Sequence, residues 1–323
     1  MPVYNGEVYL RDTLESIIAQ SYQDFELLIV DDTSTDNSYE ILLNYSQRDS
    51  RIKLFTKPNG GNAVKSIIFA LPLALGEWMF YSSQDDLFSK DLLENMYFRA
   101  LETDADAIIP DMVWYEKGER ASNAMIGINN GVKKIILSGR DAFIQSLNVK
   151  IHGFSLRRMD LVKKIGYDEL LTNSDEYATR KFYLNCRSVT FSNGTFYYNQ
   201  GNKDGLTQKF TPKAFDWILT NLRLIDLSIH NNLDKKLIDD FALKTLNHTH
   251  YLEKKLSDNL KHFSESEILA CQGILKESRQ KLNIFIKARK IKKIKKSFYK
   301  KLKTSFHKRA SRLLNKKIKL ISS

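Results

Sequence analysis

Two adjacent carboxylates end a short apolar run in the stretch Trp78-Met79-Phe80-Tyr81-Ser82-Ser83-Gln84-Asp85-Asp86. Residues 77–82 have the composition of a buried β-strand, because four of the six side chains are bulky and apolar. Open α/β sheets bind ligands at the carboxyl ends of their strands, so we expect Asp85 and Asp86 to line a pocket. Mg²⁺ and Mn²⁺ prefer carboxylate oxygens, which makes both acids candidate metal ligands. An open alternative is that they cap a helix beginning near Lys90.

Strand-like and helix-like segments alternate around this stretch. Helical spacing of apolar residues predicts helices at 6–20, 36–47 and 62–74, and β-prone runs predict strands at 25–30 and 52–56. Such alternation with short connections is typical of a doubly wound, parallel α/β sheet. Farther along we expect a strand at 105–110, a loop at 115–134, a helix at 139–148 and helices through 212–285.

Each expected strand of this first part ends in a polar cluster. The clusters are Tyr4-Asn5, Asp31-Asp32, Asn59-Gly60-Gly61 and Gln84-Asp85-Asp86. Because parallel strands end at the same edge of a sheet, we expect all four clusters to meet there. Hardly any strand precedes Tyr4, so we also expect several residues of a first strand to be missing from the sequence.

Charge is distributed unevenly along the 323 residues. The formal net charge is +12, yet residues 287–323 hold 16 Lys and Arg and no Asp or Glu. The remainder therefore has 34 basic and 38 acidic side chains, a net charge of −4. A hydrophobic content of 42% excludes disorder throughout. The longest apolar run, residues 67–75, is too short to span a bilayer, and no cleavable signal peptide is expected.

Cysteine usage argues against two kinds of stabilising site. Cys186 and Cys271 are far apart and show neither metal-ligand nor CxxC spacing. The sequence therefore indicates neither a disulfide framework nor a zinc site, which fits a reducing compartment.

Four blocks resemble, in this order, the motifs of family 2 glycosyltransferases with the GT-A fold. They are Met1-Pro-Val-Tyr-Asn-Gly-Glu7, Leu27-Leu-Ile-Val-Asp-Asp-Thr-Ser-Thr-Asp36, Gly76-Glu-Trp78 and Ser82-Ser-Gln-Asp-Asp-Leu87. The resemblance implies an α/β fold: a Rossmann-like GT-A domain at 1–208 with a mostly parallel sheet and a truncated first strand. A helical accessory region at 209–286 and a basic amphipathic tail at 287–323 would follow. It further implies a nucleotide-diphosphate sugar donor, a divalent metal (Mn²⁺ or Mg²⁺) and inverting transfer in bacterial surface-polysaccharide synthesis.

Donor-binding residues are carried over from the resemblance position by position. Pro2, Val3, Tyr4 and Asn5 match the loop that packs on the base and ribose of the donor. Asp31 matches the carboxylate that reads the edge of the base, where an acceptor facing a ring N–H favours uracil and hence a UDP-sugar.

Further donor contacts are expected beside the metal site. Gln84 is grouped with the donor-binding residues, and Lys65 or Lys57 is the nearest positive charge in sequence for the leaving diphosphate. For either lysine, a solvated surface position is the alternative.

The metal motif departs from the family pattern at one position. Asp85 matches the last acid of the DxD metal motif and Asp86 lies beside it, whereas Ser83 stands where the first acid usually is. The loss of that carboxylate should weaken metal binding. It is also the feature that favours a second hypothesis, a catalytically weak GT-A-like module that binds a membrane surface.

A catalytic base is expected at Asp175-Glu176. An inverting transferase needs a carboxylate to accept the proton of the acceptor hydroxyl as that oxygen attacks the sugar. In the family this role falls to the second acid of a Glu-Asp pair before a helix. The order is reversed here, so Glu176 matches by position and Asp175 by chemistry, and both remain candidates. Alternatively, both acids simply favour the helix N-terminus through its dipole.

The tail at 287–323 repeats apolar residues at helical spacing between lysines. Such a basic amphipathic helix is typical of a segment that lies on an anionic membrane surface. Binding of nucleic acid is the competing hypothesis and is not favoured, because aromatic residues are few and no base-reading fold is recognisable. We therefore expect a cytoplasmic protein, peripheral at the inner face of the cell membrane, that acts on a glycan or lipid-linked acceptor.

Overall fold

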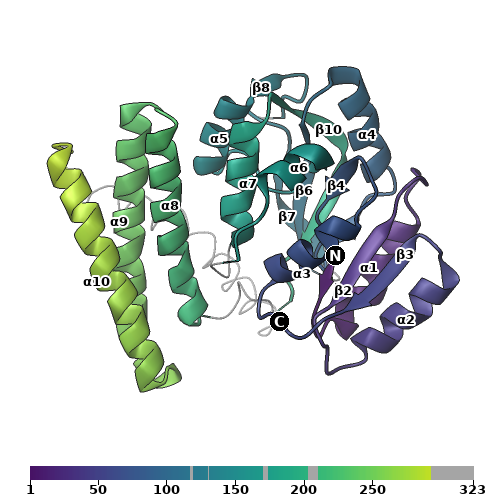
Figure 1. Ribbon diagram of the computed structural model, residues 1–323, viewed down its shortest axis with the longest axis horizontal. Helices are drawn as coiled ribbons and strands as arrows, with labels where there is room; N and C mark the ends of the chain where they lie inside the picture. Colours follow the sequence, from purple (N-terminus) through teal and green to yellow (C-terminus); the bar gives the residue numbers. More distant parts are fainter. Residues whose placement is uncertain (117–118, 130, 170–173, 203–209, 292–323) are drawn as a thin grey trace, which may run out of the picture.

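The computed structural model describes residues 1–116, 119–129, 131–169, 174–202 and 210–291 (Figure 1). Its first part consists of β1 (Pro2–Val3), α1 (Glu7–Ile18), β2 (Leu27–Asp31), α2 (Ser38–Arg48), β3 (Ile52–Thr56), α3 (Ala63–Ala70) and a 3₁₀ turn (Leu71–Leu73). The strands form a parallel sheet in the order β1-β2-β3. The alternation expected from the sequence is confirmed here, with helix ends that differ by a few residues.

A second sheet comes next in the chain. Its elements are β4 (Trp78–Phe80), β5 (Leu87–Phe88), α4 (Leu92–Thr103), β6 (Ala107–Glu116), β7 (Glu119–Met125), β8 (Ile136–Ser138), α5 (Gly139–Leu147), β9 (Leu156–Arg158), α6 (Met159–Ile165), α7 (Ser174–Asn185) and β10 (Ser188–Asn199). The strands are ordered β4-β9-β6-β10-β5, with β7 on β6 and β8 on β10.

Two expectations about this second sheet were wrong. Of its described pairings, β6 with β10 is parallel and the others are antiparallel, so the sheet is not mostly parallel. The reason is that these strands are joined by returns such as the β6–β7 hairpin rather than by a helical crossover after every strand. The same hairpin occupies part of the stretch 115–134, which we expected to be a loop.

One hydrophobic core joins the two sheets although their hydrogen-bond ladders are separate. Leu10 and Leu14 of α1 and Ile29 of β2 are fully buried against Met96 of α4 and Phe196 of β10. The apolar face of α1 and the near-continuous apolar run of β2 are therefore both buried in the core. The polar residues after the strands are left at the edge of the sheets.

Three long helices complete the described chain: α8 (Asp216–His230), α9 (Lys235–Ser257) and α10 (Glu265–Ala288). They confirm the helices expected through 212–285 and stand beside α5 and α7 (Figure 1). Phe143 and Leu147 of α5 are buried with apolar residues of all three helices. Arg223 of α8 forms an ion pair with Asp168 and places its guanidinium carbon 3.9 Å from the ring centre of Tyr177.

The proposed boundaries at 208 and 286 stay a prediction. Helix α10 continues two residues beyond 286, and Arg289 pairs with Asp239 of α9 at 2.5 Å. Most of the basic tail, 292–323, lies outside the described residues. Within the described ranges, no helix combines the length and the apolar composition needed to cross a membrane.

Candidate active site

The loop after β1 is tied directly to the end of β4. The Tyr4 N–H donates to Gln84 Oε1 at 2.7 Å, and Gln84 Nε2 donates back to the Tyr4 carbonyl at 3.0 Å. A Cβ on Gly6 would lie 2.7 Å from Gln84 Cδ, so a larger residue at position 6 would displace the Gln84 side chain from this contact. The Tyr4 residue is 47% exposed beside this contact. The structure thus brings two of the predicted donor-binding residues together and leaves an aromatic side chain open.

Asn5 and Asp31 shape the next loop along the edge. Asn5 adopts φ 50°, a left-handed conformation that Asn tolerates, and its Oδ1 accepts from the Thr35 N–H at 2.7 Å. Asp31 accepts from the Ser34 hydroxyl at 2.6 Å and from the Ser34 N–H at 3.1 Å. The Asp31 carboxylate is therefore held in one orientation. Only 3% of the residue is exposed, so its contact with a donor stays a prediction.

Pro2 and Val3 are placed less favourably for donor contact. Pro2 pairs with Val30 in the ladder, and Val3 is 1% exposed in the hydrophobic core. Their donor-binding role stays a prediction, and for Val3 the burial argues against it.

Asp32 binds the loop after β3. Its carboxylate accepts from the Gly60 N–H at 3.0 Å and forms an ion pair with Lys57, whose side chain is 11% exposed. Lys57 is thus already paired and is a poor candidate for binding phosphate. Lys65, at the start of α3, forms no ion pair with any described residue, so it is the freer of the two candidate lysines.

The two acids after β4 differ sharply in their surroundings. Asp86 is fully buried, its Oδ1 accepts from the Asn199 N–H at 3.1 Å, and its Oδ2 has no partner among the described residues. Burial, with a smaller contribution from the Asp85 charge, raises the pKa of the Asp86 carboxyl well above its usual value. Asp85 is half-buried and its Oδ2 accepts from Asn202 Nδ2 at 2.7 Å. Asp85 is therefore the accessible acid of the pair.

Two residues at this site were not singled out from the sequence. They are Asn202, which donates to the Asp85 carboxylate, and Tyr115, whose hydroxyl donates to the Asp85 backbone carbonyl at 3.1 Å. Tyr115 lies in β6, in the stretch expected to be a loop, and no sequence signal pointed to it. Asn202 lies in the polar loop after β10, where polarity alone does not distinguish it from its neighbours.

Asp175 lies in the first turn of α7. Burial first, and then the Glu176 charge, raise its pKa to about 6. The pKa of the Tyr81 hydroxyl is raised by burial and then by the charges of Asp175 and Asp86. Glu176 instead forms an i,i+4 ion pair with Arg180. The structure thus favours Asp175 over Glu176 as a base, and the role of either acid stays a prediction.

The carboxylates at this edge do not form a complete metal site by themselves. No group of three or more His, Cys, Asp or Glu side chains among the described residues could hold a metal alone. Asp86 is too buried to reach a shared ion, and its role as a metal ligand stays a prediction that its burial disfavours. One accessible carboxylate, Asp85, fits an ion such as Mg²⁺ that takes most of its remaining ligands from phosphates and water.

Comparisons with known proteins show which proteins this chain resembles. The family model described as Glycosyl transferase family 2 matches residues 1–166. Glycosyltransferase GlyG of Streptococcus pneumoniae serotype 4 is 26% identical over 215 residues, 61% of this chain and 68% of that protein. Poly(ribitol-phosphate) beta-N-acetylglucosaminyltransferase TarP of Staphylococcus aureus is 27% identical over 202 residues, 61% of this chain and 60% of that protein. The crystal structure of S. aureus TarS 1–349 in complex with UDP-GlcNAc superposes with a TM-score of 0.62 at 23% identity, covering 86% and 79% of the two chains, which shows a shared fold.

Proposed function

The chain belongs to glycosyl transferase family 2, and we propose that it is an inverting transferase that moves a sugar from a UDP-sugar to a glycan or lipid-linked acceptor in cell-surface polysaccharide synthesis. One observation carries this proposal. A fixed donor-side loop and an accessible acid, Asp85, lie together after β4, and the charge of Asp175, whose carboxyl has a raised pKa, acts on Tyr81 in the same segment of the chain. Each of them comes from a different part of the chain, so helix capping alone does not explain this arrangement.

The donor would bind along the loops that Gln84 and Asp31 hold in place. The exposed Tyr4 ring offers a surface on which the base can stack, and the Asp31 carboxylate, fixed by Ser34, can accept from a ring N–H. The similarity to the poly(ribitol-phosphate) beta-N-acetylglucosaminyltransferase TarP and to TarS, which was solved with UDP-GlcNAc, supports a nucleotide-sugar donor and a polymeric acceptor for this chain as well. Of the two candidate lysines, Lys65 would approach the diphosphate, because Lys57 is already paired with Asp32.

Asp175 would act as the general base. The acceptor oxygen forms a bond to the anomeric carbon while the bond from that carbon to the diphosphate oxygen breaks, and the hydroxyl proton moves to the Asp175 carboxylate. A carboxyl with a pKa of about 6 is ionised at neutral pH and is more basic than an ordinary Asp, as proton abstraction requires. Glu176, paired with Arg180, would help to hold the turn rather than accept the proton.

A divalent cation, Mn²⁺ or Mg²⁺, would be held by Asp85 and the donor diphosphate, where it would neutralise charge that develops on the leaving group. The contribution of the chain is to keep Asp85 in place, which the hydrogen bonds from Asn202 and Tyr115 do.

The cellular site is also part of the proposal. We place the protein at the inner face of the cell membrane, with the basic tail on anionic lipid. The second candidate, a weakly catalytic module at a membrane surface, is favoured by Ser83 at the position of an expected acid.

Asp85→Asn tests the proposal, with Asp86→Asn as its matched control. The amide at 85 should abolish the effect of Mn²⁺ on donor binding and transfer. At 86 it replaces a fully buried carboxyl that a shared ion cannot reach, so Mn²⁺ dependence should stay as in the wild type. Binding is measured by calorimetry with a panel of nucleotide sugars, and turnover by release of the nucleotide diphosphate. A wild-type protein that binds no nucleotide sugar with Mn²⁺ would favour the second candidate.

A further inference from the structure

Arg157 carries a buried charge that the proposed function does not use. The residue is 4% exposed, and its guanidinium donates to the Gly153 carbonyl at 2.6 Å, to Thr179 Oγ1 at 2.9 Å and to Ser155 Oγ at 3.1 Å. No described carboxylate forms an ion pair with it, whereas the next residue, Arg158, pairs with two aspartates. Buried charges are costly and are almost always paired, so an arginine that is held by neutral groups alone requires an explanation.

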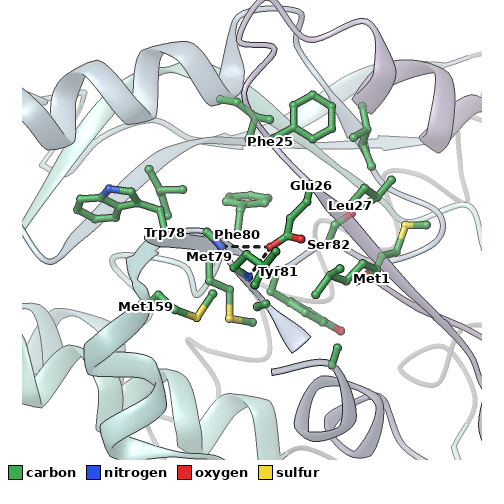
Figure 2. Close-up of a pocket in the computed structure, with 18 of the residues that line it drawn as sticks. Met1, Phe25, Glu26, Leu27, Trp78, Met79, Phe80, Tyr81, Ser82 and Met159 are labelled. Carbon is green, nitrogen blue, oxygen red and sulfur yellow. Dashed lines mark hydrogen bonds between the residues drawn. The ribbon is translucent and has the colours of Figure 1, made fainter. Parts of the chain in front are cut away.

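The backbone of Arg157 is built into the centre of the second sheet. Strand β9 lies between β4 and β6, and Arg157 is paired with Met79 of β4 and with Ala107 of β6. Met79 and Tyr81 line a cavity of about 650 Å³ where the chain leaves β4 toward Asp85 (Figure 2). The backbone of Arg157 is therefore fixed to the strand that leads to Asp85.

The side chain of Arg157 connects this sheet to helix α7. Its partner Thr179 follows Asp175 by four residues, and residues at this spacing lie on the same face of a helix. Its other partner, the Gly153 carbonyl, precedes β9 and lies close to the same helix, because a Cβ on Gly153 would be 3.2 Å from Thr179 Cγ2. One guanidinium thus ties the sheet to α7 one helical turn away from Asp175.

We propose that Arg157 is a positioning residue for the transfer reaction: it sets α7 against β4, so that the Asp175 carboxylate reaches the hydroxyl that attacks a donor held at Asp85. This inference rests on the proposed function, in which Asp175 is the base. A planar guanidinium donates to several acceptors at fixed angles, which a lysine ammonium does not. The precision matters because a displacement of about 1 Å between reacting groups costs about 10²-fold in rate.

The test starts from Arg157→Lys, which keeps the charge and loses the fixed geometry. Arg158→Lys is the matched control, because the adjacent arginine pairs with aspartates and does not contact Thr179. Thr179→Val is a second, milder variant that removes the hydroxyl bonded to Arg157. We expect kcat to fall by about 10²-fold in Arg157→Lys and by about tenfold in Thr179→Val, with the donor Kd unchanged and with a normal kcat in the control.

Rates are expressed per donor site counted by calorimetry. A merely structural defect lowers the number of sites and leaves kcat per site unchanged, so this readout separates the two roles. The second readout is the Asp175→Asn background. If Arg157 acts through Asp175, then Arg157→Lys should lower kcat by less than about threefold in that background, because residues that act as a unit are not additive.

Two outcomes would overturn the inference alone. They are an unchanged kcat per donor site in Arg157→Lys, and a further loss of about 10²-fold when it is added to Asp175→Asn. If Arg157→Lys does not fold, Thr179→Val is judged by the same criteria, with a further loss of about tenfold as the limit. Near-normal turnover of Asp175→Asn, or a wild type that transfers no sugar, would instead refute the proposed function and this inference with it.

Discussion

Replacing Asp175 by Asn should make the protein more stable and less active at the same time. The pKa of this carboxyl is raised from 3.8 to about 6, so the folded state holds its proton more tightly than the unfolded chain does. Below about pH 4 the Asp175 carboxyl is protonated in both the folded and the unfolded state, and folding is not penalised. As the pH rises to about 6 the unfolded chain loses this proton first, so the free energy of unfolding falls. At pH 7 the wild type therefore bears the full cost of an ionised, partly buried carboxylate, and a neutral amide does not.

The expected gain in the free energy of unfolding follows from the same pKa shift of Asp175. Two pKa units correspond to about 3 kcal/mol, and because Asp175 is half-buried and partly screened we expect a gain of about 1–2 kcal/mol at pH 7. This should raise Tm by about 2–6 °C at pH 7, and by close to nothing at pH 4. Turnover should fall by about 10²–10⁴-fold while donor binding is kept.

Calorimetry at the two pH values and an assay of nucleotide diphosphate release provide the measurements. Glu176→Gln is the control: it loses an i,i+4 ion pair with Arg180, worth about 0.3–0.5 kcal/mol, and it also removes a charge that raises the pKa of Asp175, so its net effect on stability at pH 7 should be smaller than that of Asp175→Asn. If Asp175→Asn melts below the wild type at pH 7, or if its Tm rises as much at pH 4 as at pH 7, then burial does not destabilise the ionised Asp175 carboxylate as inferred here. Near-normal turnover in both variants would move the base elsewhere.

Three other changes give separate tests. Removing residues 292–323 should release the protein from anionic vesicles in co-sedimentation and leave donor chemistry on a soluble acceptor intact; equal binding of both forms would contradict the membrane role. Asp32→Ala should lower the free energy of unfolding in urea by about 3–5 kcal/mol, because it leaves the nearly buried Lys57 charge unpaired. Burial raises the pKa of the Cys186 and Cys271 thiols, so both should resist a disulfide reagent at pH 8 until urea unfolds the chain.

Much of the edge that carries the site could be predicted from local patterns in the sequence. The apolar run of β2 and the helical spacing in α1 predict buried elements, and the polar residues next to them in the chain must then lie at the sheet edge. The contacts of Gln84 with the Tyr4 backbone, and of Asp32 with Gly60, confirm that these clusters meet.

The local patterns failed where distant residues decide the outcome. Asp85 and Asp86 are neighbours in the sequence, and burial sets their difference: Asp86 is fully buried and accepts from Asn199, which lies 113 residues away, whereas Asp85 stays partly exposed. The β7 segment Glu-Arg-Ala-Ser-Asn-Ala-Met lacks the alternation of a strand, and it becomes one because it pairs with β6. Lys57 is a plausible phosphate ligand by sequence alone, and its ion pair with Asp32 removes it from that role.

The stacking of Arg223 on Tyr177 bears on how this protein could be recombined with its relatives. Arg223 belongs to α8, whereas Tyr177 comes directly after the two acids at the start of α7, and Asp168 pairs with the same guanidinium. A chimaera cut at residue 209 would keep Tyr177 and exchange Arg223 for a foreign side chain. The crossover point should instead be chosen so that α5, α7 and α8 come from one parent, which makes the helical region an inherited part of the active-site scaffold rather than an interchangeable appendage.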